Sequence, residues 1–243
     1  MYYTKIMTFI IAIQLHDSII VAADTKKAIQ QEDQSISLCS DPISKLHIWK
    51  NGIITGTGDY QLISRTIEIF EKVACSQLNY LPECLRVSRQ FREREVSTPF
   101  SQIEQTKLLC SSYIEQGVQL YKVEQSDLSQ PYYLVPFEVK DINVWLVDLS
   151  IEPILSDIQS LYNNLKNYAN FSNPLDWVNY YASQIAPIFK KHSQKDLMMS
   201  PSFDLFCQTS KQSLYGHISN RPNSANSFSE IIPNPILGLL PVS

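Results

Sequence analysis

Hydrophobic residues at the start of the chain run almost without interruption in two short segments. Residues 8–15 (Thr-Phe-Ile-Ile-Ala-Ile-Gln-Leu) and 19–24 (Ile-Ile-Val-Ala-Ala-Asp) are separated by a short polar turn. Such runs, rich in β-branched residues, are typical of strands that are buried on both faces. A second pair of segments, residues 45–49 and 52–57, is joined by a two-residue polar link, which favours a tight hairpin.

Helical periodicity follows in two separate blocks. Apolar residues recur at intervals of three and four through residues 62–73, and Pro82 then opens a second helical segment. We expect these two helices to be antiparallel neighbours. The same spacing returns in residues 154–168 and 177–192, which are separated by an Asn-Pro breaker.

The middle and the end of the chain return to strand patterns. Residues 106–123 indicate a hairpin around Gly117, and residues 142–147 indicate a further strand. We therefore expect a second sheet formed by the middle of the chain. Residues 203–209 and 213–218 have the pattern of a closing hairpin.

This order of elements predicts an α+β fold. Strands, two helices, strands, two helices and a last strand pair fit two sheets packed face to face with helix pairs outside, which is a four-layer αββα sandwich. A chain of 243 residues with 44% hydrophobic content suits one domain, assigned to residues 1–219. Residues 220–243, rich in Asn, Ser and Pro, are expected to form a loose tail.

The charge pattern argues against some classes of binding partner. The net charge is −4, and the 20 Lys and Arg residues form no basic stripe, so nucleic acid and anionic membrane surfaces are poor candidates. No apolar run approaches the roughly 18 residues of a membrane span. Residues 1–7 lack the features of a secretory signal. We therefore expect a cytoplasmic protein with no nucleic-acid partner and no membrane partner.

Cysteine and histidine spacing argues against a metal centre. The odd number of cysteines, with no CxxC pair, suits buried thiols in a reducing compartment better than disulfides or a zinc site. No histidine lies three or four residues from another. The residues concerned are Cys39, Cys75, Cys84, Cys110, Cys207, His16, His47, His192 and His217.

Four short motifs occur in an order that is known from one family. They are Thr-Phe-Ile-Ile-Ala-Ile (residues 8–13), Asp-Ser-Ile-Ile-Val-Ala-Ala-Asp-Thr (17–25), Ser-Lys-Leu (44–46) and Thr-Gly-Thr-Gly-Asp (55–59). Together they resemble the proteasome β-subunit family, including its bacterial ring-protease relatives, and the order of later elements extends the likeness to Asn220. The resemblance implies the N-terminal-nucleophile (Ntn) hydrolase fold, a threonine-type peptidase that needs no cofactor, and a homo-oligomer.

The resemblance also assigns the catalytic roles. It makes Thr8 the nucleophile, Asp24 and Lys45 its supporting charged pair, and Gly58 the residue whose backbone N–H faces the developing oxyanion. A free α-amine, with a pKa of about 8, can accept the hydroxyl proton, and a nearby ammonium group favours the neutral amine. A backbone donor at the oxyanion contributes roughly 3 kcal/mol. Individually, Thr8 would be an ordinary strand residue, Asp24 a strand-end cap and Lys45 a solvated edge charge.

Two later features match the family less closely. Asp196 and Ser200 are the best counterparts of the Asp and Ser that the family places beside the nucleophile, with a spacing one residue longer than usual. A polar loop before the final hairpin explains these two residues equally well. The glycine- and serine-rich turn of the family is replaced by Val-Asp-Leu-Ser at residues 147–150.

The nucleophile of this family must be the first residue of the mature chain, and seven residues precede Thr8. Translation from Met7 followed by removal of the initiator methionine would expose Thr8, and this is the route we prefer. Self-cleavage between Met7 and Thr8 would have the same result, although residue 7 is not the usual Gly. Otherwise Thr8 stays blocked, and the protein is a non-catalytic assembly or interaction protein. A third possibility is an amidase that acts on non-peptide amides.

Overall fold

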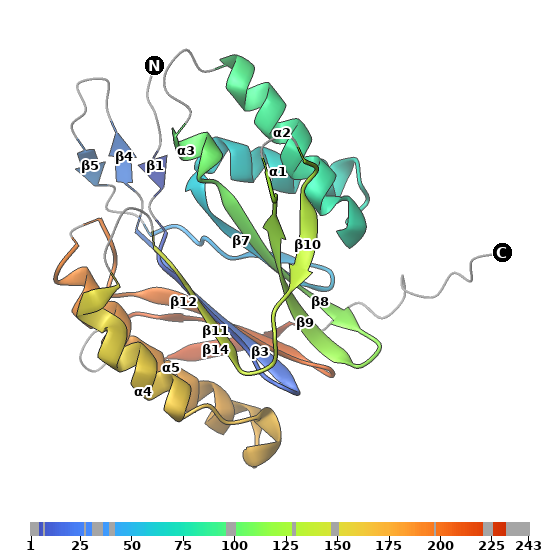
Figure 1. The fold of residues 1–243 in the computed structure, drawn as a ribbon. Coiled ribbons are helices and arrows are strands. Elements are labelled where there is room, and N and C mark those ends of the chain that lie inside the picture. The colour runs from blue at the N-terminus through green and yellow to red at the C-terminus, as the bar shows by residue number, and fades with distance from the viewer. Residues whose placement is uncertain are drawn as a thin grey trace.

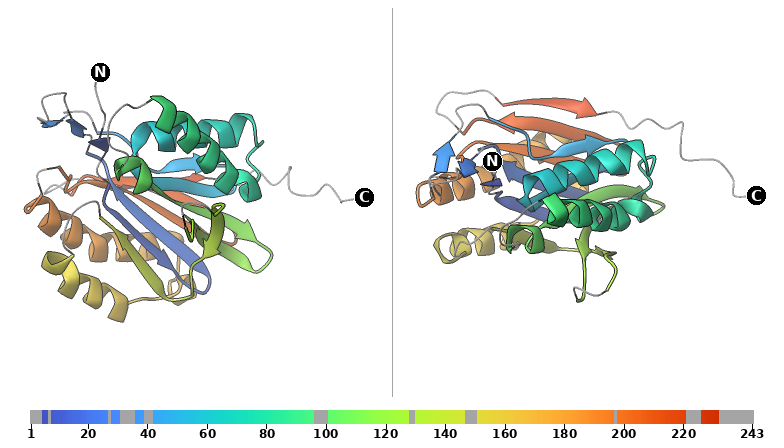
Figure 2. Two further views of the ribbon diagram at one scale, coloured as in Figure 1. Left: turned by 45° about the horizontal axis from the view of Figure 1, so that its top comes forward. Right: turned by 90° about the horizontal axis from the view of Figure 1, so that it is seen from above.

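Two antiparallel sheets face each other, and helices cover the outer face of each sheet (Figure 1). Two further views show the same layering from other sides (Figure 2). This is a computed structural model of the chain. It describes residues 5–6, 8–26, 28–30, 36–38, 42–95, 101–127, 130–146, 151–196, 198–220 and 226–231.

Each sheet has six strands, and a small two-stranded sheet lies apart from them. The first sheet contains, in spatial order, β1 (Lys5–Ile6), β7 (Gly52–Asp59), β8 (Lys107–Ile114), β9 (Gly117–Glu124) and β10 (Tyr133–Pro136), with β6 (His47–Trp49) also paired to β7. The second contains β11 (Asp141–Trp145), β2 (Ile10–Gln14), β3 (Ser18–Asp24), β12 (Phe203–Thr209), β13 (Ser213–Ile218) and β14 (Ser227–Ile231). The small sheet pairs β4 (Ala28–Gln30) with β5 (Ile36–Leu38).

The helices divide between the two outer faces (Figure 1). The first sheet carries α1 (Tyr60–Lys72), α2 (Leu81–Glu95) and the short α3 (Ser101–Glu104). The second sheet carries α4 (Leu155–Asn163) and α5 (Pro174–Ser193). Single 3-10 turns are η1 (Leu78–Tyr80), η2 (Glu152–Ile154) and η3 (Tyr168–Asn170).

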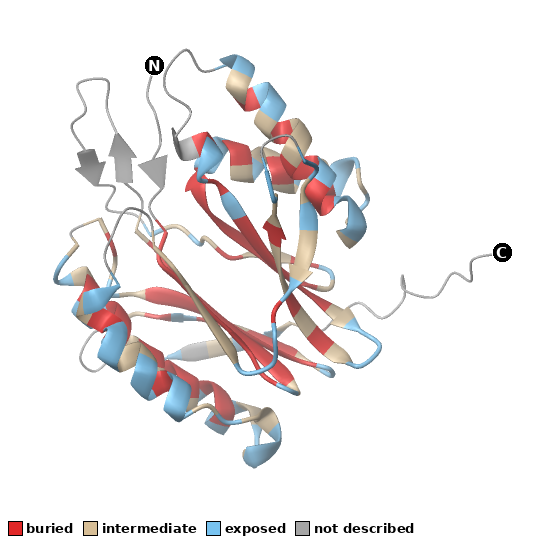
Figure 3. Ribbon diagram, viewed as in Figure 1, coloured by how far each residue is buried: buried red, intermediate tan, exposed pale blue. Residues whose placement is uncertain are grey.

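Alternation along β2 explains the unbroken apolar run at the start of the chain. Ile11 and Ile13 point into the core between the second sheet and its helices, whereas Ile10 and Ala12 point into the core between the two sheets. Because both faces are buried, the run from Ile10 to Ile13 is entirely apolar. Figure 3 shows the central strands coloured as buried along most of their length, while buried and exposed residues alternate along the helices. The expected α+β fold with a four-layer αββα arrangement is confirmed.

Two glutamines join the sheets across the central core. Gln14 Oε1 accepts the backbone N–H of Leu120 at 2.7 Å, and Gln208 Oε1 accepts the hydroxyl of Ser111 at 2.8 Å. Both glutamines are buried. A buried amide is costly unless it is paired, so these contacts fix how the two sheets are positioned against each other.

The prediction that residues 142–147 form a sheet with the hairpin of residues 106–123 is wrong. The strand exists as β11, but it pairs with β2 and not with the hairpin of β8 and β9. This position lets Ile142 and Val144 pack against the core under α5. Pairing between segments far apart in the sequence is decided by such burial, which local pattern does not reveal.

The prediction of a loose tail from residue 220 is wrong for part of its length. Residues Ser227–Ile231 form β14, which pairs with β13 from Ser213 to His217. Phe228 packs against one core and Ile231 against another, so this strand protects an otherwise open edge. Phe228 and Ile231 stand among Asn, Ser and Pro residues, and two apolar positions are too few to predict a strand.

Membrane-spanning helices and cysteine thiols were also considered in the sequence-based expectations. In the described part of the chain, no helix combines the length and apolarity needed to cross a membrane. Cys84, Cys110 and Cys207 are buried free thiols, and Cys75 is an exposed one. Cys39 lies outside the described residues.

Replacing Phe189 by Ala should lower the free energy of unfolding by about 3 to 5 kcal/mol, because it leaves a cavity in a packed core. The ring of Phe189 stacks on Phe203 at 4.5 Å and lies 4.6 Å from Phe9. The matched control is Phe91→Ala, at a half-exposed position, where we expect a much smaller change. Denaturant unfolding measures both, and equal losses would contradict the packing of α5 on its sheet.

Candidate active site

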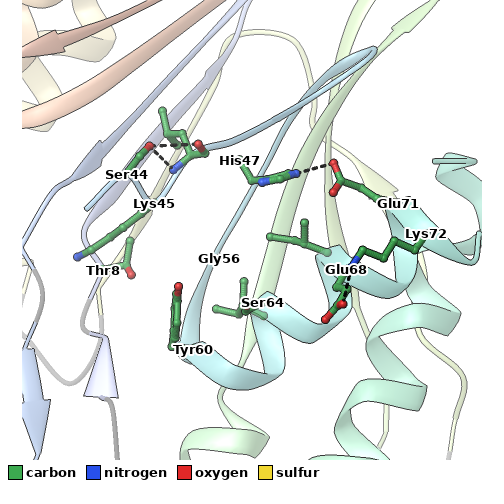
Figure 4. A pocket seen from close by; sticks show the side chains of 13 residues that line it. Thr8, Ser44, Lys45, His47, Gly56, Tyr60, Ser64, Glu68, Glu71 and Lys72 are labelled. Atoms are coloured by element: carbon green, nitrogen blue, oxygen red, sulfur yellow. Dashed lines mark hydrogen bonds and ion pairs between the residues drawn. The ribbon is translucent and has the colours of Figure 1, made fainter. Parts of the chain in front are cut away.

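A pocket of about 510 Å³ opens beside Thr8, between the loop that leads into β6, the strand β7 at Gly56 and one face of α1 (Figure 4). Thr8 lies just before β2, and the loop that leads into β6 supplies Lys45. The pocket is lined by Thr8, Ser44, Lys45, Leu46, His47, Gly56, Tyr60, Ile63, Ser64, Ile67, Glu68, Glu71 and Lys72.

A buried ion pair lies behind the nucleophile candidate. Lys45 Nζ is 2.7 Å from Asp24 Oδ1, and the two side chains are 4% and 0% exposed. The same Oδ1 accepts the backbone N–H of Phe9 at 2.9 Å, and Oδ2 accepts that of Lys26 at 3.1 Å. Asp24 therefore connects Lys45 directly to the residue that follows Thr8.

Two opposing effects act on the pKa of Lys45. Burial lowers the pKa of its ammonium group, and the carboxylates of Asp24, Asp196 and Asp204 act in the other direction. The backbone of Lys45 is fixed as well, because its carbonyl accepts the hydroxyl of Thr55 at 2.8 Å. Figure 4 shows the Lys45 side chain extending toward Thr8.

Thr8 is 3% exposed overall but lines the pocket with its side chain. Its hydroxyl makes no hydrogen bond with the described residues, so a ligand in the pocket would meet an uncommitted Oγ. In the full chain its nitrogen belongs to the peptide bond with Met7, which lies outside the described residues. Just before it, β1 pairs with β7, with Ile6 opposite Gly58.

Strand geometry shows where the N–H groups of β7 point. The N–H groups of Ile53 and Asp59 donate to Ser111 Oγ and Thr106 Oγ1, both on the β8 side of the strand. Because successive N–H groups of a strand point to opposite edges, that of Gly56 points away from β8. That edge is the one on which β6 and β1 lie.

Gly56 occupies the gap between these two short neighbours. The pairing of β6 with β7 ends where His47 lies opposite Ile54, and the pairing of β1 begins where Ile6 lies opposite Gly58. No described strand covers Gly56 on this edge, and Gly56 lines the pocket together with Thr8. The backbone edge of Gly56 is therefore open to the pocket.

Gly58, the glycine chosen from the sequence, lies elsewhere. It does not line the pocket, and its N–H edge is the one that β1 covers. Its φ is +116°, and an added Cβ would lie 2.4 Å from Thr106 Oγ1. Gly58 is therefore explained by backbone conformation and by the close approach of Thr106.

Asp196 and Ser200 follow α5 and do not line the pocket. Asp196 Oδ1 accepts the N–H of Met198 at 2.9 Å, and Ser200 Oγ accepts that of Ser202 at 3.0 Å, so each shapes a local turn. Asp196 also acts electrostatically on Lys45, whereas Ser200 has no such link. Residues 147–150 lie outside the described residues.

His192, in the last turn of α5, is a residue that the sequence analysis missed. It is 2% exposed, its ring lies 5.0 Å from that of Phe9, and neither ring nitrogen has a hydrogen-bond partner among the described residues. Oδ2 of Asp196 is likewise buried and unpaired within the described part of the chain. Burial lowers the pKa of His192, and the charges of Asp196 and Asp24 oppose this effect.

The described residues contain no group of three His, Cys, Asp or Glu side chains placed to bind a metal ion. What the pocket contains instead is a hydroxyl, a buried ammonium group and a backbone edge. Such an arrangement suits nucleophilic attack on a carbonyl, provided that a base is present to take the hydroxyl proton.

In its fold, the protein is an α+β sandwich of two antiparallel sheets between layers of helices. Solved structures with this fold include Anbu from Hyphomicrobium sp. strain MC1, with a TM-score of 0.52 and 10% identity, over 93% of this chain and 88% of that chain. The Anbu (Gly-1) mutant from the same strain has a TM-score of 0.56 and 11% identity over the same shares. Eukaryotic HslV from Trypanosoma brucei reaches a TM-score of 0.47 at 12% identity, over 83% and 99% of the two chains.

The assignment of the fold rests on the two Anbu structures. At this level of identity the likeness shows the fold alone. Comparison of the sequence with protein-family models and with curated proteins gives no match.

Replacing Asp24 by Asn should destabilise the fold by about 3 kcal/mol, because Lys45 would keep its buried position without the countercharge. The control is Asp157→Asn, which removes the carboxylate of an exposed ion pair with Lys191 and should cost less than about 1 kcal/mol. Denaturant unfolding at pH 7 measures both. A cost for Asp24→Asn no larger than that of the control would show that the pair is not buried in solution.

Replacing His192 by Phe should make the fold less sensitive to acid. Because the pKa of His192 is lowered in the fold, the unfolded chain takes up a proton first as the pH falls below about 6.5, and stability is lost. His192→Phe should therefore lose less stability than the unmodified protein between pH 7.5 and pH 5.5, by at most about 1.4 kcal/mol. The control is His16→Phe, at an exposed position, and a parallel shift in both variants would refute the effect.

Proposed function

We propose that the protein is a threonine-type hydrolase of amide bonds, a peptidase whose nucleophile is Thr8 once its α-amine is free. The observation that carries this proposal is the position of Thr8 in the pocket, beside the buried pair of Lys45 and Asp24. An ordinary strand residue would not need a buried lysine next to its hydroxyl, and burying that lysine is costly. The proteasome-like fold supports the proposal at the level of fold.

In the proposed reaction, Thr8 Oγ attacks the substrate carbonyl while the α-amine of the same residue takes the hydroxyl proton. The positive charge of Lys45 favours the neutral form of this amine, and Asp24 favours the charged form of Lys45. The amine then returns the proton to the leaving nitrogen, and an acyl-enzyme forms. Water, activated by the same amine, releases the acyl group and restores Thr8.

The proposed donor to the oxyanion is the N–H of Gly56. It points to the open edge of β7 inside the pocket, whereas Gly58 does not line the pocket. A single backbone donor of this kind contributes roughly 3 kcal/mol to stabilisation of the transition state. Our proposal therefore moves this role two residues along the Thr-Gly-Thr-Gly-Asp motif.

Activation requires removal of residues 1–7. Either translation from Met7 with loss of the methionine, or cleavage before Thr8, would supply the free amine. Either event would also remove β1 and open the edge of β7 at Gly58 and Asp59. Asp196 and Ser200 are supporting residues in this proposal, the former through its charge on Lys45.

A second candidate is a non-catalytic protein with the same fold and a blocked Thr8. The observation that favours it is β1 itself, because residues Lys5–Ile6 are built into the first sheet and are not simply an overhang. Under this candidate the pocket would be a binding site only. A homo-oligomeric, cytoplasmic assembly remains our expectation under both candidates, and non-peptide amides remain an alternative substrate class.

The test compares three proteins: the full chain, a chain that begins at Met7, and the same shortened chain with Thr8→Ala. Intact-mass spectrometry first establishes whether the shortened chain begins at Thr8. We expect this protein to hydrolyse fluorogenic peptides, and Thr8→Ala to lower kcat at least about a thousandfold, as for other nucleophiles. The full chain should be inactive until residues 1–7 are removed.

Thr8→Ser serves as the conservative control, since it keeps a hydroxyl nucleophile and should retain measurable activity. Equal hydrolysis by the protein that begins at Thr8 and by its Thr8→Ala variant would refute the proposal. An inactive but correctly folded protein with a free Thr8 amine would favour the non-catalytic candidate.

A further inference from the structure

The pocket beside Thr8 continues as a groove along one face of α1. The α1 residues that line it are spaced at intervals of three and four, which places them on one side of the helix. They are Tyr60, Ile63, Ser64, Ile67, Glu68 and Glu71, with Lys72 at the end. From Tyr60 to Glu71 this face rises about 16 Å, at 1.5 Å per residue.

The chemistry of the groove changes along its length. Near Thr8 it is bounded by Tyr60, and its middle is aliphatic, with Ile63 and Ile67. The far end carries the acidic side chains of Glu68 and Glu71 (Figure 4). A ligand that lies in the groove therefore passes from the nucleophile over apolar surface to a negatively charged end.

The two carboxylates at the far end are not equally neutralised. Glu68 Oε1 is paired with Lys72 Nζ at 2.8 Å, and this contact lowers the pKa of Glu68. Glu71 Oε1 faces His47 Nε2 at 2.8 Å, which balances its charge only when that ring is protonated. Among the side chains that line this end, two glutamates face one lysine, and Glu71 is the carboxylate that makes no ion pair with that lysine, while Arg65 also acts on Glu68.

We propose that this groove selects peptide substrates that carry a Lys or Arg side chain, with Glu71 as the specificity-determining residue. This inference rests on the proposed function, because it takes Thr8 as the reacting end of the groove. The aliphatic part of a Lys or Arg side chain packs on Ile63 and Ile67, and its cationic group reaches the acidic end. An acidic side chain is repelled there, and an apolar side chain provides no countercharge for Glu71.

Binding is measured on the Thr8→Ala chain that begins at Met7, so that no cleavage intervenes. Four peptides each carry one Arg at one of the four positions before the target bond, and four matched peptides carry citrulline, which has the same shape but no charge. For the position that reaches the groove, we expect the Arg peptide to bind about fivefold more tightly, the effect of a partly exposed ion pair. Fluorescence polarisation gives each Kd.

Two variants locate the effect. Glu71→Gln should reduce the ratio of the two affinities to about one, because the carboxylate that distinguishes them is gone. Glu83→Gln, which removes an exposed carboxylate paired with Arg86 on α2, should leave the ratio unchanged. Circular dichroism and thermal unfolding of both variants confirm that they are folded.

The outcomes separate the inference from the proposed function. Equal affinities for Arg and citrulline peptides at all four positions, or no peptide binding, would overturn the groove assignment even if the protein with a free Thr8 hydrolyses other peptides. A preference for Arg that depends on Glu71, without hydrolysis by that protein, would keep the groove and reject the catalytic role of Thr8. A preference that survives Glu71→Gln would also overturn the assignment.

Discussion

The ion pair between Lys45 and Asp24 is the interaction on which the rest of the site depends. Its two side chains are almost completely buried, and Asp24 also accepts the backbone N–H of Phe9. A buried pair of this kind contributes little net stability, because desolvation offsets the attraction of the charges. Its consequence is positional, since one carboxylate fixes both the lysine and the start of β2.

That positional constraint determines what the pocket can do. With the start of β2 fixed, the hydroxyl of Thr8 faces the pocket beside Lys45, and the open edge of β7 at Gly56 lies on the same pocket. The buried lysine alone does not suggest catalysis, because buried lysines also occur in purely structural ion pairs. The combination of nucleophile, charge and backbone donor in one pocket gives the catalytic proposal its physical content.

The segment that precedes Thr8 adds a condition to this picture. In the full chain, Lys5–Ile6 extends the first sheet beside Gly58 and Asp59, and the nitrogen of Thr8 is an amide with no basic lone pair. In the catalytic proposal, the peptide bond to Met7 therefore leaves Thr8 without the free amine that would act as the base. The described fold and the pocket are present in this form.

Much of the fold was predictable from the sequence, because the elements with a clear period were the ones buried on definite faces. The strands from Phe203 to Thr209 and from Ser213 to Ile218 have the predicted bounds. The partner of β11 and the existence of β14 were not predictable, since both depend on which distant edge was left open. Local pattern contains no information about such edges.

The residues of the site also include some that the sequence predicts and others that it does not. The order of motifs was enough to bring Asp24 and Lys45 together with Thr8. It could not separate Gly56 from Gly58, because the difference lies in which of the two lines the pocket. His192 and the acidic end of the α1 groove belong to no recognisable motif, because packing alone places His192 against Phe9 and the groove beside Thr8.

The most direct test of the central claim is to locate a covalent adduct. The protein that begins at Thr8 is treated with a threonine-directed covalent inhibitor, and peptide mapping by mass spectrometry identifies the modified residue. The account predicts one adduct per chain, on Thr8, and none when residues 1–7 are retained. An adduct on another residue, or a folded chain with a free Thr8 amine that remains unmodified, would contradict it.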